Sequence, residues 1–186
     1  MGSGPSLSRE DVQRVRELDL RSIAINTIAI DYAPWSDFVY AADTAWWTKY
    51  YGCLVRSSCK ITCNDSVQFA DVHLLRNTGI KGFDPDSRCI RTGQNSGYQA
   101  LHIALQTGAS RVLLLGIDMT IEHGLHCHGP HPKGLSNPTE KYFQRCLTHW
   151  GDLRKAADSI GCEVINCSRF SKLECFPKMT LSQACG

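Results

Sequence analysis

Residues 95–118, NSGYQALHIALQTGASRVLLLGID, decide the fold class of this 186-residue chain. The first half of the stretch has apolar residues at helical spacing and ends at Gly108, a residue type that commonly follows the last turn of a helix. The second half, residues 111–118, is continuously hydrophobic until its polar end at Asp118. Such a run is typical of a central strand in a parallel sheet, where helices cover both faces.

Short apolar runs and helical patterns alternate on both sides of this stretch. Strands are predicted over residues 23–30, 37–43, 60–65, 72–77, 111–118 and 162–168. Helices are predicted over residues 44–52, 95–108 and 137–161, the last with Asn137 or Thr139 as its cap, Pro138 in its first turn and Gly161 at its end. The alternation predicts one α/β domain over residues 1–186, with three layers and a mostly parallel sheet between helices.

Composition and charge argue against several classes of protein. The chain is 42% hydrophobic and 20% charged, as is typical of a globular protein. Its net charge is +2 without a basic run or stripe, so we expect no nucleic-acid partner. No apolar run approaches the roughly 18 residues that span a bilayer, and no cleavable signal is evident. We therefore expect a cytoplasmic protein with no integral membrane segment.

The cysteine content is high, at ten residues, but no two of them form a CxxC pair. Small disulfide-bonded scaffolds place their cysteines more densely and lack long apolar strands. Cys146 and Cys162 fall within hydrophobic patterns, where a free cysteine acts as a small core residue. We therefore predict that most of the ten are reduced thiols.

Polar residues stand at the ends of several predicted strands, and Asn26 interrupts the first of them. In an open parallel sheet, ligands bind beyond the carboxyl ends of the strands. The helix that begins near residue 95 would offer free backbone N–H groups and a positive dipole end to a phosphate or carboxylate. Each residue alone is a common strand-end amide, turn former or cap, but together they predict a small-molecule site. They are Asn26, Asp43, Asn64, Asp65, Asn95, Ser96, Gly97 and Asp118.

Residues 119–137 form the longest irregular stretch, and we predict a mobile, histidine-rich loop there. Imidazole and thiolate groups at close spacing can bind zinc, and a histidine can also act as a general acid or base near neutral pH. No CxxC, HExxH or matching HxxxH pattern accompanies the loop, so the acid–base role is preferred to zinc and no metal ligand is assigned. A plain exposed polar loop is the first interpretation, ahead of both chemical roles. The residues concerned are His123, His126, Cys127, His128 and His131.

The chain opens with GSGPSL, residues 2–7, a glycine-rich turn that precedes a helix start at Ser8 and Asp11. A phosphate-binding turn normally follows a strand, and here no strand precedes it. An expression scar is one alternative interpretation. Myristoylation at Gly2, with the Ser6 that this motif needs, is another.

Three blocks in order carry a resemblance to a known superfamily: GSGPSL, a strand with Asn26, and RTGQNSGYQALHIALQTGASRVLLLGIDM, residues 91–119. They resemble proteins with a Rossmann-like fold that include the bacterial sialyltransferases of glycosyltransferase family 42. The domain-of-unknown-function 115 proteins, with the archaeal 6-hydroxymethylpterin diphosphokinase among them, belong to the same group. The resemblance implies a Rossmann-like nucleotide-binding domain that lacks the usual first strand, and it favours a native GSGPSL turn.

The resemblance also implies roles for individual residues. The turn would cradle a nucleotide phosphate, with the helix start near residue 95 on the far side of the nucleotide. A histidine before the last long helix would be the general base, and His131 or His128 stands at the comparable place. The implied nucleotide-binding residues are Ser3, Gly4, Pro5, Ser6, Asn26, Asp43, Asn95, Ser96, Gly97 and Asp118.

The expected function is transfer of a group from a nucleotide or nucleotide-sugar donor to a hydroxyl acceptor. One alternative is a pterin-type diphosphokinase in which Asp43 and Asp118 would hold Mg²⁺, and another is a non-catalytic protein that sequesters a nucleotide-derived ligand. No other cofactor is expected.

The chain departs from the sialyltransferases in two ways. It is shorter, with little room for an acceptor-binding lid. The place of the first strand would be empty, filled by another segment or supplied by sequence upstream. An open strand position also invites pairing between chains, which would make a homo-oligomer.

Overall fold

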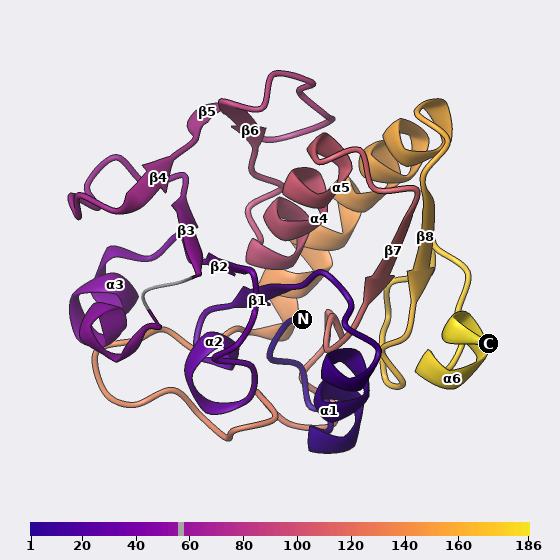
Figure 1. Cartoon of the computed structure of the whole chain (residues 1–186), viewed down its shortest axis with the longest axis horizontal. Coiled ribbons are helices and arrows are strands. Elements are labelled where there is room, and N and C mark those ends of the chain that lie inside the picture. The colour runs from indigo at the N-terminus through magenta and orange to yellow at the C-terminus, as the bar shows by residue number, and fades with distance from the viewer. Residues whose placement is uncertain (56–57) are drawn as a thin grey trace.

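The computed structural model describes residues 1–55 and 58–186 and shows mixed helices and parallel strands, as predicted (Figure 1). The strands are β1 (Ile23–Ile25), β2 (Phe38–Tyr40), β3 (Cys59–Thr62), β4 (Val72–Leu74), β5 (Arg76–Gly79), β6 (Cys89–Arg91), β7 (Arg111–Leu114) and β8 (Glu163–Asn166). The helices are α1 (Arg9–Glu17), α2 (Ile28–Asp31), α3 (Thr44–Tyr50), η1 (Tyr51–Cys53), α4 (Ser96–Gln106), α5 (Glu140–Ser159) and α6 (Leu181–Cys185).

Every strand pair in the described residues is parallel. One sheet has the order β1-β2-β3-β4, with Ala24 opposite Val39 and Ile61 opposite His73. β7 pairs with β8, and β5 pairs with β6. The carboxyl ends of parallel strands lie at one edge, so the residues that follow β1, β2, β3 and β7 come together there.

The N-terminal residues join the two larger groups of strands. The Met1 amine donates to the Ile23 carbonyl at 2.8 Å, and the Ile25 N–H donates to the Met1 carbonyl at 3.0 Å. On the other side, the Gly2 N–H donates to the Leu115 carbonyl at 2.8 Å. The chain therefore begins between β1 and β7, and the N label lies in the middle of Figure 1. Residues 1–4 therefore occupy only part of the place where a first strand was expected, namely the part near the carboxyl ends of β1 and β7.

Beyond Met1, the space between β1 and β7 is an apolar cavity of about 320 Å³, which we call the β1–β7 slot. Ile23 and Leu113 line its two strand edges, and Leu101 and Ala104 of α4 line one face. The carbonyls of Ser110 and Leu114 accept hydrogen bonds from the N–H groups of Glu163 and Cys167, on the side of β8. Backbone groups of successive residues in a strand point to opposite sides, so the amide and carbonyl of Leu113 point away from β8, toward the slot.

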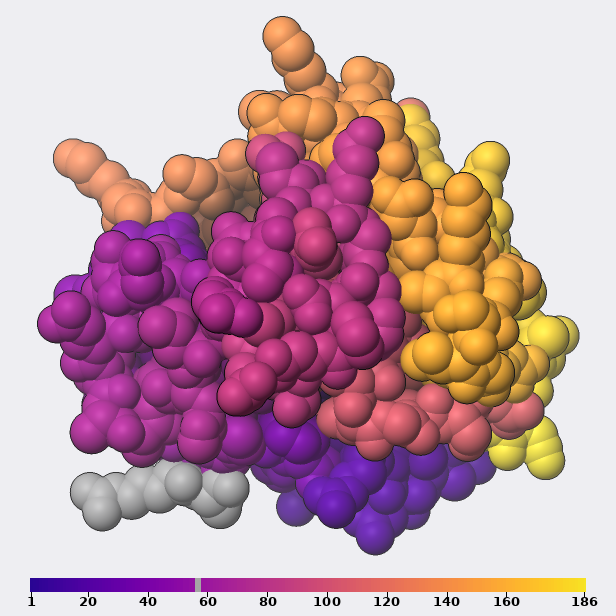
Figure 2. Space-filling view, turned by 90° about the horizontal axis from the view of Figure 1, so that it is seen from above, coloured from indigo at the N-terminus to yellow at the C-terminus, as the bar shows by residue number. Residues whose placement is uncertain are grey.

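Helices cover both faces of the sheet. On one face, Leu101 of α4 and Trp150 of α5 lie in one core cluster with Leu114 of β7. On the other, Val15 of α1 packs in one cluster with Trp47 of α3, and this cluster also includes residues of α2 and α6. Figure 2 shows the first of these faces, where the purple to magenta segments from β4 to α4 lie beside the orange α5. This layering is the predicted α/β arrangement.

Two predicted strands differ from the structure. The run 23–30 ends as a strand at Ile25, because Asn26 adopts a φ of +51° and turns the chain into α2. The run 72–77 is divided between two partners: β4 pairs with β3, and the Arg76 N–H donates to the Arg88 carbonyl next to β6. Neither β6 nor α6 was predicted. In the last long helix, Thr139 is the cap, so Pro138 lies outside the first turn where it was expected.

All ten cysteines lie in the described residues and are free thiols, where the sequence predicted this for most of them. No helix among the residues that the structure describes is both long and apolar enough to cross a membrane.

Candidate functional site

A cleft of about 710 Å³ opens at the carboxyl ends of the parallel strands. It is lined by the N-terminal turn, by the residues that follow β1, β2, β3 and β7, by the start of α4, and by the histidine loop. Most of the predicted site residues line it. They are Ser3, Gly4, Asn26, Asp43, Asn64, Asn95, Ser96, Gly97, Asp118 and His131, whereas Pro5, Ser6, Asp65 and His128 are not lining residues.

The glycines of the N-terminal turn allow it to lie against the end of β7. A Cβ at Gly2 would come within 2.7 Å of the Gly116 carbonyl oxygen, and one at Gly4 within 2.5 Å of the Asp118 carboxyl carbon. The amides of Gly2, Gly4 and Ser6 all donate within the fold. Within residues 1–55 and 58–186, only Ser3 of the turn keeps a backbone N–H without an acceptor. The turn therefore offers a phosphate one amide instead of the expected cradle.

The Asp118 side chain holds this turn in place by hydrogen bonds. Its carboxylate accepts from the Ser6 N–H at 2.8 Å and also from the Ser6 hydroxyl. Burial raises the pKa of Asp118, although both bonds from Ser6 favour the charged form. Ser6 thus acts behind the cleft wall, which explains why it is buried and does not line the cleft.

The N-terminus of α4 forms the opposite wall. The Asn95 side chain caps the helix by accepting from the N–H groups of Gly97 at 2.9 Å and Tyr98 at 3.2 Å. In the described part of the chain, the Ser96 N–H has no acceptor, so it is available to a ligand at the positive end of the helix dipole. The Tyr142 hydroxyl donates to the Gln94 carbonyl at 2.7 Å and so fixes α5 against this wall.

Backbone strain concentrates at the cleft. Among the described residues, four non-glycine residues have a positive φ: Asp19, Asn26, Gln94 and Met119. The last three line the cleft, and each costs on the order of 1 kcal/mol. The Asn26 Oδ1 atom is also buried, with no hydrogen-bond donor among the described residues. An unpaired buried oxygen on a strained residue is a feature expected of a ligand contact.

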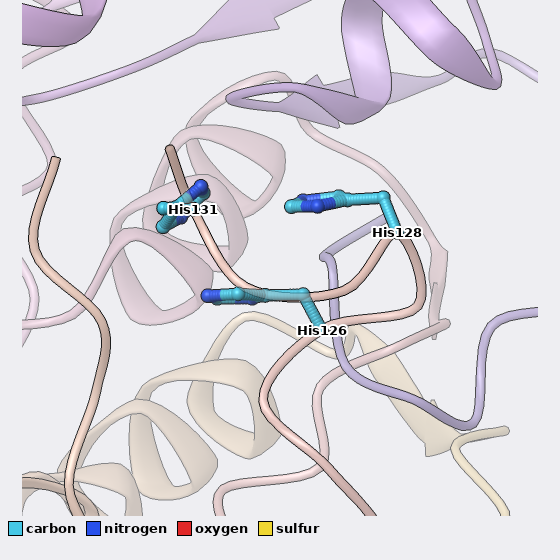
Figure 3. Close-up of side chains that lie close together, drawn as sticks. All are labelled: His126, His128 and His131. Atoms are coloured by element: carbon cyan, nitrogen blue, oxygen red, sulfur yellow. The ribbon is translucent and has the colours of Figure 1, made fainter. Parts of the chain in front are cut away.

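Three histidines of the loop converge beside the turn (Figure 3). One ligand atom from each of His126, His128 and His131 lies within 4.8 Å of the others. The ring centroids of His126 and His131 are 4.2 Å apart, and those of His126 and His128 are 5.0 Å apart. The His126 Nδ1 atom forms a 2.8 Å hydrogen bond with the Ser3 hydroxyl. The loop is thus attached to the N-terminal turn.

A tight reversal of the chain produces this convergence. The Cys127 N–H donates to the Ser3 carbonyl at 2.8 Å, and the Gly129 N–H donates to the His126 carbonyl at 3.0 Å. Gly129 has a φ of +82°, which glycine adopts without strain, and the following segment returns His131 toward His126. Spacing alone did not indicate this, so His126 was not among the residues assigned to the site.

The other two loop residues considered for zinc lie apart from the cluster. The His123 ring stacks on Phe170, with centroids 4.3 Å apart. Cys127 packs against one of the two main cores, and its carbonyl accepts from the Tyr32 hydroxyl at 3.1 Å.

Within the cluster, burial is the main reason that the pKa of His126 falls to about 4, and the neighbouring histidines have a smaller effect. Burial also lowers the pKa of His131.

The residues considered for Mg²⁺ fit it poorly. Mg²⁺ requires several oxygen ligands in octahedral geometry. Both oxygens of Asp118 accept from Ser6, and the Asp43 Oδ1 atom caps α3 by accepting from the Ala45 N–H at 2.9 Å. These two carboxylates therefore serve the fold, and we assign no step to a magnesium ion.

Neither a family model, nor a curated protein, nor a solved structure matches this chain.

Proposed function

We propose that the chain is a Rossmann-like protein that binds a nucleotide or nucleotide-sugar donor in the cleft and transfers a group from it to a hydroxyl acceptor. The observation that carries the proposal is the unpaired Asn26 Oδ1 atom, on a strained residue of a cleft at the carboxyl ends of parallel strands. Ligands of open α/β sheets bind at this edge. The resemblance of residues 2–7 and 91–119 to nucleotide-using proteins supports the same class of ligand.

Different parts of the cleft would hold different parts of the donor. The Asn26 oxygen can accept from a ribose hydroxyl or a base amino group. The Ser96 and Ser3 N–H groups, together with the dipole of α4, would stabilise the phosphate. Charge on the departing phosphate would be stabilised by the same groups during transfer.

A substitution that relieves strain and removes the contact tests this proposal sharply. Asn26→Gly restores an unstrained φ and deletes the amide, so the free protein should be at least as stable and the ligand should bind more weakly. The measurement is the shift of Tm with CMP, UMP, ATP, GTP and CMP-sialic acid, each with and without Mg²⁺.

Asp19→Gly is the matched control, because Asp19 has a φ of +50° but lies away from the cleft. It should leave every ligand-induced shift unchanged. The proposal fails if no nucleotide raises the Tm of the folded parent chain, or if Asn26→Gly and Asp19→Gly respond alike. Slow hydrolysis of the bound donor would identify a transferase, and an unchanged donor would identify a protein that only sequesters it.

A further inference from the structure

The three converging histidines leave three ring nitrogens without partners. The His126 Nε2, His128 Nε2 and His131 Nδ1 atoms are buried, and no group in the described part of the chain bonds to them. Buried polar atoms are normally hydrogen-bonded, because an unpaired one loses its hydration without compensation. One missing partner is a common local defect, but here all three unpaired nitrogens belong to rings that can each offer one ligand atom within 4.8 Å of the others, which indicates a shared partner. We propose that this partner is a transition-metal ion of the zinc type.

The donor set matches that class of ion. Imidazole is the preferred ligand of Zn²⁺ and its neighbours in the first transition row, whereas Mg²⁺ and Ca²⁺ prefer oxygen. Tetrahedral Zn–N bonds of about 2.1 Å place the nitrogens about 3.4 Å apart, so ligand atoms that already lie within 4.8 Å of one another need only a small closure.

The neighbouring Ser3 holds one of the rings in the protonation state that a metal requires. For the His126 Nε2 atom to bind metal, the ring proton must be on Nδ1, from which it donates to the Ser3 hydroxyl at 2.8 Å. Hydrogen bonds of this kind commonly orient the histidine ligands of metal sites. The same serine lines the cleft, so the N-terminal turn connects the metal site to the ligand site.

The site leaves a coordination position for a ligand. Zinc sites with three protein ligands keep a fourth position for water or substrate, whereas structural sites are closed by four. His126 and His131 both line the cleft, so a molecule bound in the cleft would lie next to two of the three ligands. The ligand class is an anionic oxygen of a phosphate or carboxylate. His131 and His128 are then metal ligands and no longer the general base that the resemblance implied.

The test is titration of the metal-free full chain with Co²⁺ under reducing conditions, followed by competition with Zn²⁺. We expect one equivalent to bind, with visible absorption typical of tetrahedral cobalt and without a thiolate charge-transfer band. His126→Ala, His128→Ala and His131→Ala should each abolish this spectrum. Ser3→Ala should weaken binding by about 10-fold, because it removes only the orienting hydrogen bond.

His123→Ala is the matched control, since it removes an imidazole of the same loop that stacks on Phe170 outside the cluster. It should bind cobalt as the parent chain does. Folding of each variant is checked by circular dichroism without metal, and Ser3→Ala preserves the test if a histidine variant unfolds. The proposal is overturned if the parent chain binds no stoichiometric metal, if a thiolate band appears, or if His123→Ala loses binding as the others do.

Discussion

At the scale of single residues, His102 is a fully buried group that should make stability depend on pH. Its Nε2 atom accepts from the Asp84 N–H at 3.0 Å and from the Arg91 N–H at 3.4 Å. Burial lowers the pKa of His102 from 6.5 to about 4. Between these values the unfolded chain binds a proton that the folded chain does not, so stability falls as pH falls. The full loss, complete below pH 4, is about 3 kcal/mol.

His102→Gln keeps a hydrogen-bond acceptor and removes the titration. Urea unfolding of both chains between pH 4.5 and 7.5 should therefore show a shallower decline in the variant. All other groups are the same in both proteins, so their effects cancel in the comparison. An equal decline in both chains would mean that His102 does not control this dependence.

At the scale of elements, the sequence predicts the helices better than the strand boundaries. The capping box of Ser8 and Asp11 and the cap at Thr139 are local hydrogen bonds, so local sequence contains them. The end of β1 depends on the left-handed φ of Asn26, and the division of residues 72–77 depends on two different partner strands. Neither of these can be deduced from hydrophobic pattern.

Substitution of two glycines by alanine should change the stability of the chain in opposite directions, because the two lie in different packing environments. A Cβ at Gly4 would lie 2.5 Å from the Asp118 carboxyl carbon, so Gly4→Ala should cost about 1–3 kcal/mol. Gly151 is exposed within α5 and has open space around it, so Gly151→Ala should stabilise by about 0.5–1 kcal/mol. Urea denaturation midpoints measure both changes. A neutral Gly4→Ala would contradict the close contact between the turn and β7.

At the scale of the whole molecule, the edge of the cleft is predictable and its histidine cluster is not. The rule that ligands bind beyond parallel strands predicted Asn26, Asp43 and Asp118, and all three line the cleft, although Asn26 was expected to interrupt its strand and not to end it. The cluster depends on contact between Ser3 and His126, which are 123 residues apart. It also depends on the reversal at Gly129. Such long-range contacts have no local signal.

The β1–β7 slot makes a prediction about the sheet as a whole. Among residues 1–55 and 58–186, no backbone group bonds to the Leu113 amide at this edge of β7, and α4 supplies apolar walls. The Met1 amine at the end of the slot has a pKa lowered to about 5 by desolvation. Five alternating valine and threonine residues fused before Met1 would replace that amine by a peptide bond, pair with β1 and β7 and fill the slot. Burial of two side chains should then stabilise the chain by about 2 kcal/mol, raising its Tm by roughly 4–8 °C.

A glycine–serine extension of the same length is the control, because it also removes the amine but contributes little apolar surface. Hydrogen exchange at the Leu113 amide separates pairing from a general effect of the extension, since only an inserted strand gives this group a partner. Protection of Leu113 together with the higher Tm would show that the slot accepts a strand. Equal Tm values of the two extended chains and an unprotected Leu113 amide would mean that the slot does not accept a strand. Its walls would then pack against each other, and residues 1–4 alone would bridge β1 and β7.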